Sequence, residues 1–379
     1  MIDIEKIRAE TPGINFSTHL LACGSSLMPQ SVVDVILEHT QLEALMGGYE
    51  AEEKKIDELN KVYETVAEHI GAKSHEIALM ENSTVAWSHA FYALPLKSGS
   101  RILTSEAEYA ANYVAFLQRA KRDNLKIDIV PSDQNGTLDI NVLEDMIDES
   151  VGLIAISWIP TNGGLVNPAE KVGQVAKKYN IPYLLDACQA AGQMSINVKK
   201  IECDFLSATG RKFLRGPRGT GFLYIKEKWL DTIEPVMIDH FGAPWVEKNV
   251  YELREDARRF ETWENSYALR AGLGEAINYA EKIGIDLIHE RVQLLAGENR
   301  KLLSEIKKVQ IRDIGMEQCG IISFSIEEKH NPKNIVNQMS DAGFAIGLVD
   351  PESTLIDSEK RNLPTLLRIC LLYTSPSPR

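Results

Sequence analysis

The chain has 379 residues, enough for one large domain and a smaller one. Its composition, 44% hydrophobic and 25% charged, is ordinary for a globular protein, and its net charge of -13 disfavours binding to nucleic acid or to an anionic membrane surface. No apolar run approaches the length of a membrane span and the first residues lack the layout of a signal peptide, so we expect a cytoplasmic location.

Short apolar strands alternate with amphipathic helices through the middle of the chain. We expect strands at residues 77–80, 101–104, 126–130, 152–157, 181–185, 205–207 and 221–225. Helices are expected between them at residues 83–94, 110–121, 138–147 and 168–178. This order predicts an α/β fold with a mostly parallel sheet, and functional side chains near the carboxyl ends of its strands.

The pattern changes after the last of these strands. Residues 235–263 are irregular and aromatic, and residues 268–308 have a helical pattern. A strand at 321–326, a helix at 332–342 and a late strand at 367–369 then predict a smaller α+β domain. We expect a large domain at residues 1–245 and a small C-terminal domain at residues 246–379. From about residue 371 the chain has the composition of a non-native tail, so we expect the small domain to be truncated at its end.

The cysteines and histidines show no metal-ligand spacing. The five cysteines are scattered and odd in number, which favours reduced thiols with mostly structural roles. The eight histidines form no HxxxH or similar cluster, so the sequence gives a metal site no support.

Several polar residues follow predicted strands. Ser83 and Thr84 come directly before a helix, whose free N–H groups and hydroxyls suit a phosphate. Tyr109 follows a strand, where its ring is placed to stack on a flat aromatic ligand. Asp186 ends an apolar strand, and a nearly buried carboxylate there needs a cationic partner such as a protonated pyridine nitrogen.

Lys212 lies between small hydroxylated residues and a glycine-rich turn. A lysine that forms a Schiff base needs such a setting, because partial burial and the neighbouring Arg211 ease the loss of its proton. Arg368, in the late strand, has the fork that binds a carboxylate bidentately. Taken alone, each feature also fits a helix cap, a packed tyrosine, a solvated lysine or an ion-paired arginine. Their joint occurrence in this order is more specific.

With these motifs the sequence resembles the class V group of pyridoxal-phosphate enzymes, which includes cysteine desulfurases, selenocysteine lyases and isopenicillin-N-epimerase-like proteins. The resemblance runs from about residue 15 to residue 368 and is tightest at residues 184–224. It implies the aminotransferase-type fold (fold type I), with a mostly parallel mixed sheet in the large domain and a smaller α+β domain. It also implies a homodimer.

The same resemblance implies roles at the cofactor. Lys212 would form an aldimine with pyridoxal 5'-phosphate and later move protons at the substrate α-carbon. Asp186 would pair with the pyridinium nitrogen, and Gln189 would contact the ring hydroxyl. Tyr109 stands where many relatives carry a ring-stacking histidine.

The phosphate and the substrate have implied partners of their own. Ser83 and Thr84 would hold the phosphate. Arg211 would aid them, together with Ser207 or Thr209. Arg368 would bind the substrate α-carboxylate, and Asn162 would lie near the substrate.

Three departures from the family pattern bear on the reaction. Desulfurases carry a mobile-loop cysteine shortly before the carboxylate-binding arginine, whereas residues 345–364 contain none here. Tyr109 also replaces a histidine that desulfurases use as an acid or base. The Arg-Phe-Glu stretch at residues 259–261 matches the family, but residues 262–267 lack the Gly-Thr pair that helps hold the phosphate across a dimer interface.

We therefore predict a pyridoxal-phosphate-dependent enzyme that acts on a small amino acid, and we favour a β-eliminating C–S lyase. A class V aminotransferase or an amino-acid epimerase stays an alternative. From a different class, a nucleotide-binding domain could use residues 216–221 as its phosphate loop, although these glycines precede a strand instead of following one. A catalytically silent scaffold is the remaining alternative.

Overall fold

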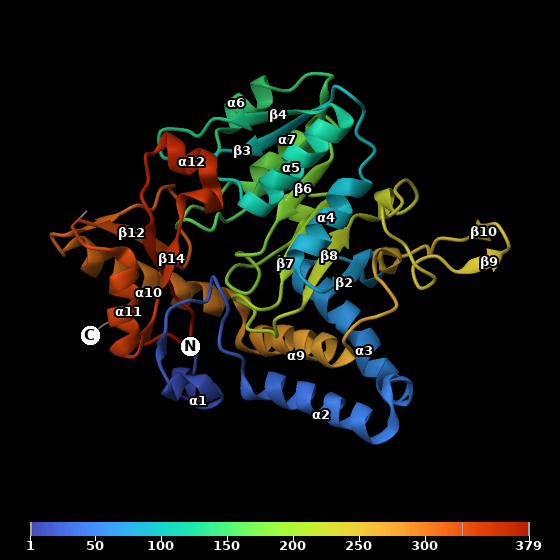
Figure 1. The fold of residues 1–379 in the computed structure, drawn as a ribbon, viewed down its shortest axis with the longest axis horizontal. Helices are drawn as coiled ribbons and strands as arrows, with labels where there is room; N and C mark the ends of the chain where they lie inside the picture. The colour runs from blue at the N-terminus through green and yellow to red at the C-terminus, as the bar shows by residue number, and fades with distance from the viewer. Residues whose placement is uncertain (1, 328, 378–379) are drawn as a thin grey trace.

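The computed structural model describes residues 2–327 and 329–377, and Figure 1 shows a large sheet covered by helices beside a smaller sheet. Within these residues the large sheet has seven strands in the order β2-β8-β7-β6-β5-β3-β4. They are β2 (Ile77–Met80), β3 (Arg101–Ser105), β4 (Lys126–Val130), β5 (Val151–Ser157), β6 (Tyr183–Asp186), β7 (Phe205–Thr209) and β8 (Gly221–Ile225). Only β8 runs antiparallel to its neighbours β2 and β7, which confirms the mostly parallel α/β sheet.

The predicted helices between these strands are confirmed, with small changes at their ends. They are α4 (Ser83–Ala93), α5 (Ala110–Asp123), α6 (Ile140–Asp145) and α7 (Ala169–Lys178). The short α8 (Val198–Ile201), between β6 and β7, was not predicted. Helix α6 begins later than expected because the Asp139 carboxylate accepts hydrogen bonds from the N–H groups of Asn141 and Val142. Helix α7 turns Val172, Val175 and Ala176 into the core, as its helical spacing requires.

A helical layer lies at one end of the sheet, and only its last helix was predicted from the sequence, within residues 268–308. It contains α2 (Gln30–Met46), α3 (Gly48–Ile70) and α9 (Tyr267–Ile283), which pack against one another in Figure 1. The short α1 (Ile4–Ala9) precedes them, and α10 (Ile285–Ser304) follows α9. Gly284, with φ of 96°, divides the predicted helical stretch 268–308 into α9 and α10. No helix of the described residues is long and apolar enough to cross a membrane.

The smaller sheet is antiparallel and has the order β11-β12-β15-β14. Its strands are β11 (Val309–Ile311), β12 (Ile321–Ile326), β14 (Gly347–Val349) and β15 (Leu366–Cys370). Helix α11 (Pro332–Asp341) packs near β14 and β15, and β1 (Thr18–His19) pairs with β13 (Phe344–Ala345). The short helix α12 (Leu355–Lys360) lies between β14 and β15 in the chain. A division into residues 1–245 and 246–379 stays a proposal.

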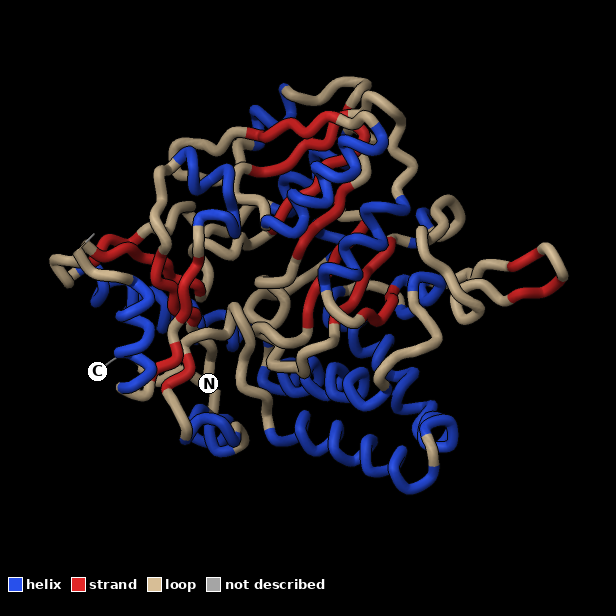
Figure 2. The backbone as a smooth tube through the Cα atoms, in the orientation of Figure 1, coloured by secondary structure: helices blue, strands red, loops and turns tan. Residues whose placement is uncertain are grey.

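The aromatic segment after β8 carries a hairpin that stands away from the body of the protein, as Figure 2 shows. Its strands are β9 (Trp245–Glu247) and β10 (Val250–Tyr251), and the Trp245 side chain is 74% exposed. Short 3-10 turns complete the described elements: η1 (Pro12–Asn15), η2 (Ser74–Glu76), η3 (Glu227–Trp229), η4 (Ala257–Phe260) and η5 (Pro351–Thr354).

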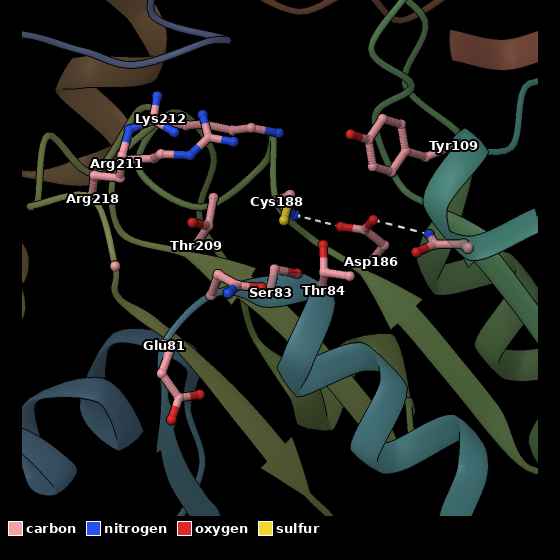
Figure 3. Close-up of a pocket in the computed structure, with 13 residues that line it drawn as sticks. Glu81, Ser83, Thr84, Tyr109, Asp186, Cys188, Thr209, Arg211, Lys212 and Arg218 are labelled. Carbon is pink, nitrogen blue, oxygen red and sulfur yellow. Dashed lines mark hydrogen bonds between the residues drawn. The ribbon is translucent and has the colours of Figure 1, made fainter. Parts of the chain in front are cut away.

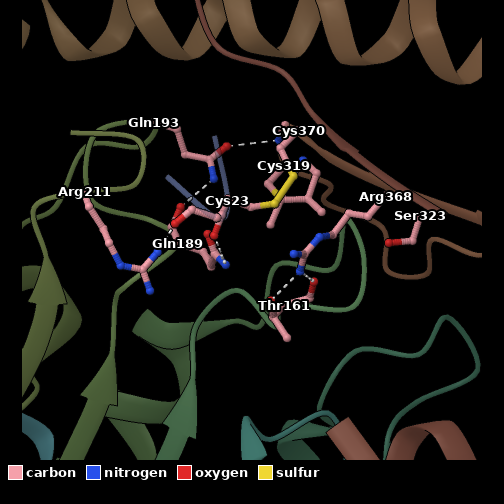
Figure 4. The surroundings of a disulfide bond; sticks show 12 residues. Cys23, Thr161, Gln189, Gln193, Arg211, Cys319, Ser323, Arg368 and Cys370 are labelled. Atoms are coloured by element: carbon pink, nitrogen blue, oxygen red, sulfur yellow. Dashed lines mark hydrogen bonds between the residues drawn. A yellow bond between two sulfur atoms is a disulfide. The ribbon is translucent and has the colours of Figure 1, made fainter. Parts of the chain in front are cut away.

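The two ends of the described chain meet beside the smaller sheet. Cys23 and Cys370 form a disulfide with a Cα–Cα distance of 5.8 Å, as Figure 4 shows, which differs from the expectation of reduced thiols. Residues 371–375, which belong to the stretch expected to be a non-native tail, are buried. The fully buried Arg215 donates a hydrogen bond of 2.9 Å to the Tyr373 hydroxyl, which ties this segment to the turn after β7.

Candidate functional site

A cavity of about 300 Å³ lies at the ends of β2, β6 and β7. Most of the predicted site residues line it: Ser83, Thr84, Tyr109, Asp186, Thr209, Arg211 and Lys212. Figure 3 shows Lys212, Arg211 and Arg218 on one side of the pocket, and Tyr109 with Asp186 on the opposite side. Residues far apart in the sequence therefore meet where a parallel sheet places its functional groups.

The N-terminus of α4 forms one wall of this cavity. The Asn82 side chain accepts a hydrogen bond of 3.0 Å from the Val85 N–H. The N–H groups of Ser83 and Thr84 have no partner within the helix, because they belong to its first turn. The Ser83 hydroxyl donates a hydrogen bond of 3.1 Å to the Ser207 hydroxyl. Ser207 itself does not line the cavity, but it contacts a residue that does. A Cβ at Gly221 would lie 3.0 Å from the Ser83 nitrogen, so only glycine lets the helix start approach β8 this closely.

Lys212 points its amine into the cavity from the turn after β7, and its side chain is partly buried. Burial lowers the pKa of Lys212, since it disfavours the charged form; the nearby cations Arg211 and Arg368 lower it further, whereas Cys188 and Asp186 oppose the shift. The Arg211 guanidinium donates to the Gly24 carbonyl, which holds it against the N-terminal segment. A lysine in this position has a larger neutral fraction than an exposed one.

Asp186 ends β6 and its side chain is buried at 7% exposure. Its Oδ1 accepts a hydrogen bond of 2.9 Å from the Cys188 N–H, and its Oδ2 accepts one of 3.0 Å from the Asn112 amide. These two donors hold the carboxylate in one orientation and leave acceptor capacity facing the cavity.

Tyr109 is the residue before α5, and it is 38% exposed at the edge of the cavity. Burial is the main cause that raises the pKa of Tyr109, and the negative charge of Asp186 raises it further. The hydroxyl therefore stays protonated at neutral pH and can donate a hydrogen bond, and the ring is free to cover a flat ligand.

Gln189 and Arg368 lie outside the lining of the cavity. Gln189 donates a weak hydrogen bond of 3.3 Å to the Cys23 carbonyl, and its Oε1 is buried with no partner among the described residues. Arg368 donates to the carbonyl and hydroxyl of Thr161 at 2.7 Å, as Figure 4 shows. Burial lowers the pKa of Arg368 to about 10, and its Nε has no partner within the described chain.

Asn162 also lies outside the cavity, although it follows the same strand as Thr161 in the chain. Its amide donates a hydrogen bond of 2.6 Å to Asp357 Oδ2 in α12, and both side chains are buried. The Asn162 amide therefore fastens α12 to the loop after β5.

Four side chains of the site were missed by the sequence analysis. Arg218 and Cys188 line the cavity, and so does Asn112, whose amide contacts both Asp186 and the buried Glu108. Arg218 and Cys188 are close in sequence to Lys212 and Asp186, which was an available signal. Glu108 directly precedes Tyr109, which was a similar signal, whereas Asn112 gave none, because its importance depends on where α5 places it.

The arrangement fits pyridoxal phosphate. A phosphate suits the free N–H groups at the start of α4 and the guanidinium of Arg211. A pyridinium nitrogen suits the buried Asp186 carboxylate, and an aldehyde carbon suits a lysine with a lowered pKa. The orphaned Gln189 Oε1 is an acceptor of the kind that a ring hydroxyl needs.

Comparison with known proteins agrees with this description. A model of the family described as "Aminotransferase class-V" matches residues 18–373. A "Probable cysteine desulfurase" of Pyrococcus abyssi is 26% identical over 343 residues, which are 89% of this chain and 85% of that protein.

Two solved structures are similar to the whole chain. The apo structure of cysteine desulfurase from Thermococcus onnurineus NA1 superposes with a TM-score of 0.92 and 26% identity, over 99% of this chain and 94% of the other. The cystine C-S lyase C-DES, in complex with cysteine persulfide, has a TM-score of 0.87 and 19% identity, over 97% of this chain and 96% of the other. The second likeness concerns the fold.

Proposed function

We propose, because the chain belongs to the aminotransferase class-V family, that this pyridoxal-phosphate-dependent enzyme cleaves the C–S bond of a cysteine-derived amino acid. Lys212 carries the proposal: a lysine with a lowered pKa shares one cavity with a buried aspartate and the start of a helix. That combination supports covalent attachment of the cofactor and proton transfer by the same amine.

Different residues would hold the phosphate and the ring of the cofactor. Ser83, Thr84 and Arg211 would hold the phosphate, with Thr209 on the same wall and Ser207 supporting Ser83 from behind. Asp186 would face the ring nitrogen and Gln189 the ring hydroxyl, while Tyr109 would cover the ring.

When bound, pyridoxal phosphate supplies an electron sink for the carbanion character at the substrate α-carbon. Arg368 would bind the substrate carboxylate through the donors that Thr161 leaves free, among them the unpartnered Nε. The neutral Lys212 amine would take the α-proton. The electron pair then forms the α–β double bond while the C–S bond breaks and its pair leaves with sulfur. Water would hydrolyse the released enamine to pyruvate and ammonia.

The cysteines support elimination over transfer of sulfur to the protein. Residues 345–364, where desulfurases carry their loop cysteine, contain none, and residues 355–360 form α12. Cys188 does line the cavity, but burial raises the pKa of its thiol to about 12. A thiol with that pKa is almost wholly protonated at neutral pH and is a weak nucleophile.

The test is an assay of the purified protein with cysteine, cysteine conjugates and alanine, without a keto-acid acceptor. We expect pyruvate and a sulfur product in equal amounts from the cysteine compounds. Strict dependence on a keto acid would instead indicate an aminotransferase, and inversion at the α-carbon without pyruvate would indicate an epimerase. Either result contradicts the proposed elimination.

The role of Lys212 has its own control. Borohydride reduction should fix the cofactor on Lys212, which peptide mass mapping detects. Lys212→Ala should abolish this labelling and the turnover, whereas Lys228→Ala, at a half-exposed lysine in η3, should change neither. Labelling at another lysine would contradict the assignment.

We also propose that two copies of the chain associate. Large apolar side chains are exposed on the projecting hairpin and where α2 meets α3: Leu45, Met46, Tyr49, Trp245, Val246, Val250 and Tyr251. Such exposed apolar groups are typical of an interface. Sedimentation should give a dimer, which Trp245→Glu weakens; a monomer at micromolar concentration contradicts this.

A further inference from the structure

The carboxylate of Glu108 is buried behind the cavity, at 3% exposure. It lies in the turn between β3 and α5, one residue before Tyr109. A buried carboxylate is costly unless its oxygens are satisfied by donors. One of the donors that satisfy the Glu108 carboxylate also contacts Asp186.

Donors surround both oxygens of Glu108. Oε1 accepts hydrogen bonds from the Ser157 hydroxyl at 2.6 Å, the Asn112 amide at 2.8 Å and the Tyr109 N–H at 2.9 Å. Oε2 accepts from the Ser157 N–H at 2.8 Å and from the Thr104 hydroxyl at 3.1 Å. These bonds fix the carboxylate to the ends of two adjacent strands, β3 and β5.

Asn112 links this carboxylate to the cavity. Its Nδ2 donates to Glu108 Oε1 at 2.8 Å and to Asp186 Oδ2 at 3.0 Å. An amide nitrogen has two protons, so one can go to each carboxylate. Glu108 therefore sets the orientation of the Asn112 amide, and Asn112 in turn sets the orientation of Asp186.

We propose that Glu108 and Asn112 are positioning residues that hold the Asp186 carboxylate toward the pyridine nitrogen of bound pyridoxal phosphate. The inference rests on the proposed cofactor site. Without Glu108, the Asn112 amide can rotate and present its oxygen to Asp186, which would place two acceptors against each other. Without Asn112, Asp186 keeps only the Cys188 N–H as a fixed partner.

The experiment is a double-mutant cycle of Glu108→Gln and Asn112→Ala on the full chain. The first readout is the dissociation constant of pyridoxal phosphate. The second is the ring-nitrogen NMR shift of ¹⁵N-labelled cofactor, which reports protonation of that nitrogen. A buried glutamate at the opposite end of β2, Glu76, accepts two backbone N–H bonds, so Glu76→Gln is the matched control.

We expect each single variant to weaken cofactor binding by about tenfold and to move the nitrogen shift toward the unprotonated value. Because Glu108 acts through Asn112, the double variant should be no weaker than Asn112→Ala, and Glu76→Gln should match the wild type. Additive losses, or an unchanged nitrogen shift in both single variants, would overturn the positioning role.

Folding and cofactor binding are checked separately. Circular dichroism reports whether each variant folds, and if Asn112→Ala does not, the isosteric Asn112→Asp takes its place; its carboxylate would repel Asp186 and should weaken binding at least as much. A wild-type protein that binds no pyridoxal phosphate overturns the proposed function and this inference together. A wild type that binds it, with variants that bind equally well, overturns only the inference.

Discussion

Asp357 accepts a hydrogen bond of 2.6 Å from the Asn162 amide, and it accepts a second of 3.1 Å from Arg361. The first bond crosses from α12 to the loop after β5, and Lys360 makes a further ion pair with Glu106 beside it. Helix α12 is thus fastened to two loops that follow strands of the large sheet.

Removing this fastening should loosen α12. We expect Asp357→Ala to lower the free energy of unfolding by about 2 kcal/mol, because the buried Asn162 amide loses its acceptor. Chemical denaturation measures the loss, and limited proteolysis should find a new cut near residue 357. Glu359→Ala, at an exposed position of the same helix, should change the free energy by less than about 0.5 kcal/mol.

The amine of Lys212 should become reactive at a lower pH than the amine of an exposed lysine. Only the neutral amine reacts, and burial lowers the pKa of Lys212, so its labelling by acetic anhydride in the cofactor-free protein should rise at a lower pH than for an exposed lysine. Arg211→Gln removes a cation that lowers this pKa and should move the midpoint up. Arg218→Gln, in the same cavity, should move it less. A midpoint above that of exposed lysines contradicts the electrostatic description.

Cys188 should be dispensable for C–S cleavage. Cys188→Ala keeps the backbone N–H that holds Asp186, and the thiol it removes has a pKa of about 12. We expect the turnover of Cys188→Ala to lie within about threefold of that of the wild type. In the wild type, we expect Cys188 to be alkylated slowly at neutral pH. A loss of sulfur release together with a persulfide on Cys188 would instead support sulfur transfer to the protein.

Gly192 lies against the backbone of residues 213–214, directly after Lys212. It has φ of 93°, and a Cβ there would lie 2.4 Å from the Leu214 nitrogen. We expect Gly192→Ala to cost about 2 kcal/mol or more and to weaken cofactor binding, because residues 213–214 must shift. Gly297 faces open space in α10, so Gly297→Ala should stabilise the helix by about 0.5–1 kcal/mol. Urea unfolding compares the two; equal stabilities would contradict the steric argument.

The strands of the large sheet could be predicted because each is a short apolar run between helices. Residues 152–157 are an example, since β5 is almost wholly buried. Helices α2 and α3 were missed, and the layer that they form with α9 could not be predicted because its packing joins segments more than 200 residues apart. The break at Gly284 was also missed, because residues 268–308 were predicted only as a helical stretch, whereas the positive φ of Gly284 ends α9.

Some residues of the site could be predicted from the sequence, and others could not. Lys212 and Asp186 have neighbours in sequence that favour a chemical role, and the structure brings both into one cavity. Glu108 is next to Tyr109, but its own role could not be predicted, because its partners Thr104 and Ser157 come from the ends of two different strands. Contacts of this kind depend on the register of the sheet, which local pattern does not specify.

The bond between Cys23 and Cys370 makes most of the chain a covalent ring, since the two cysteines are 347 residues apart. A single proteolytic cut within that ring leaves both fragments joined through the bridge. The nicked protein would then keep its mass on a non-reducing gel and separate into pieces only after a thiol is added. The N-terminal segment that supports Arg211 and the strand that carries Arg368 would stay attached through such damage.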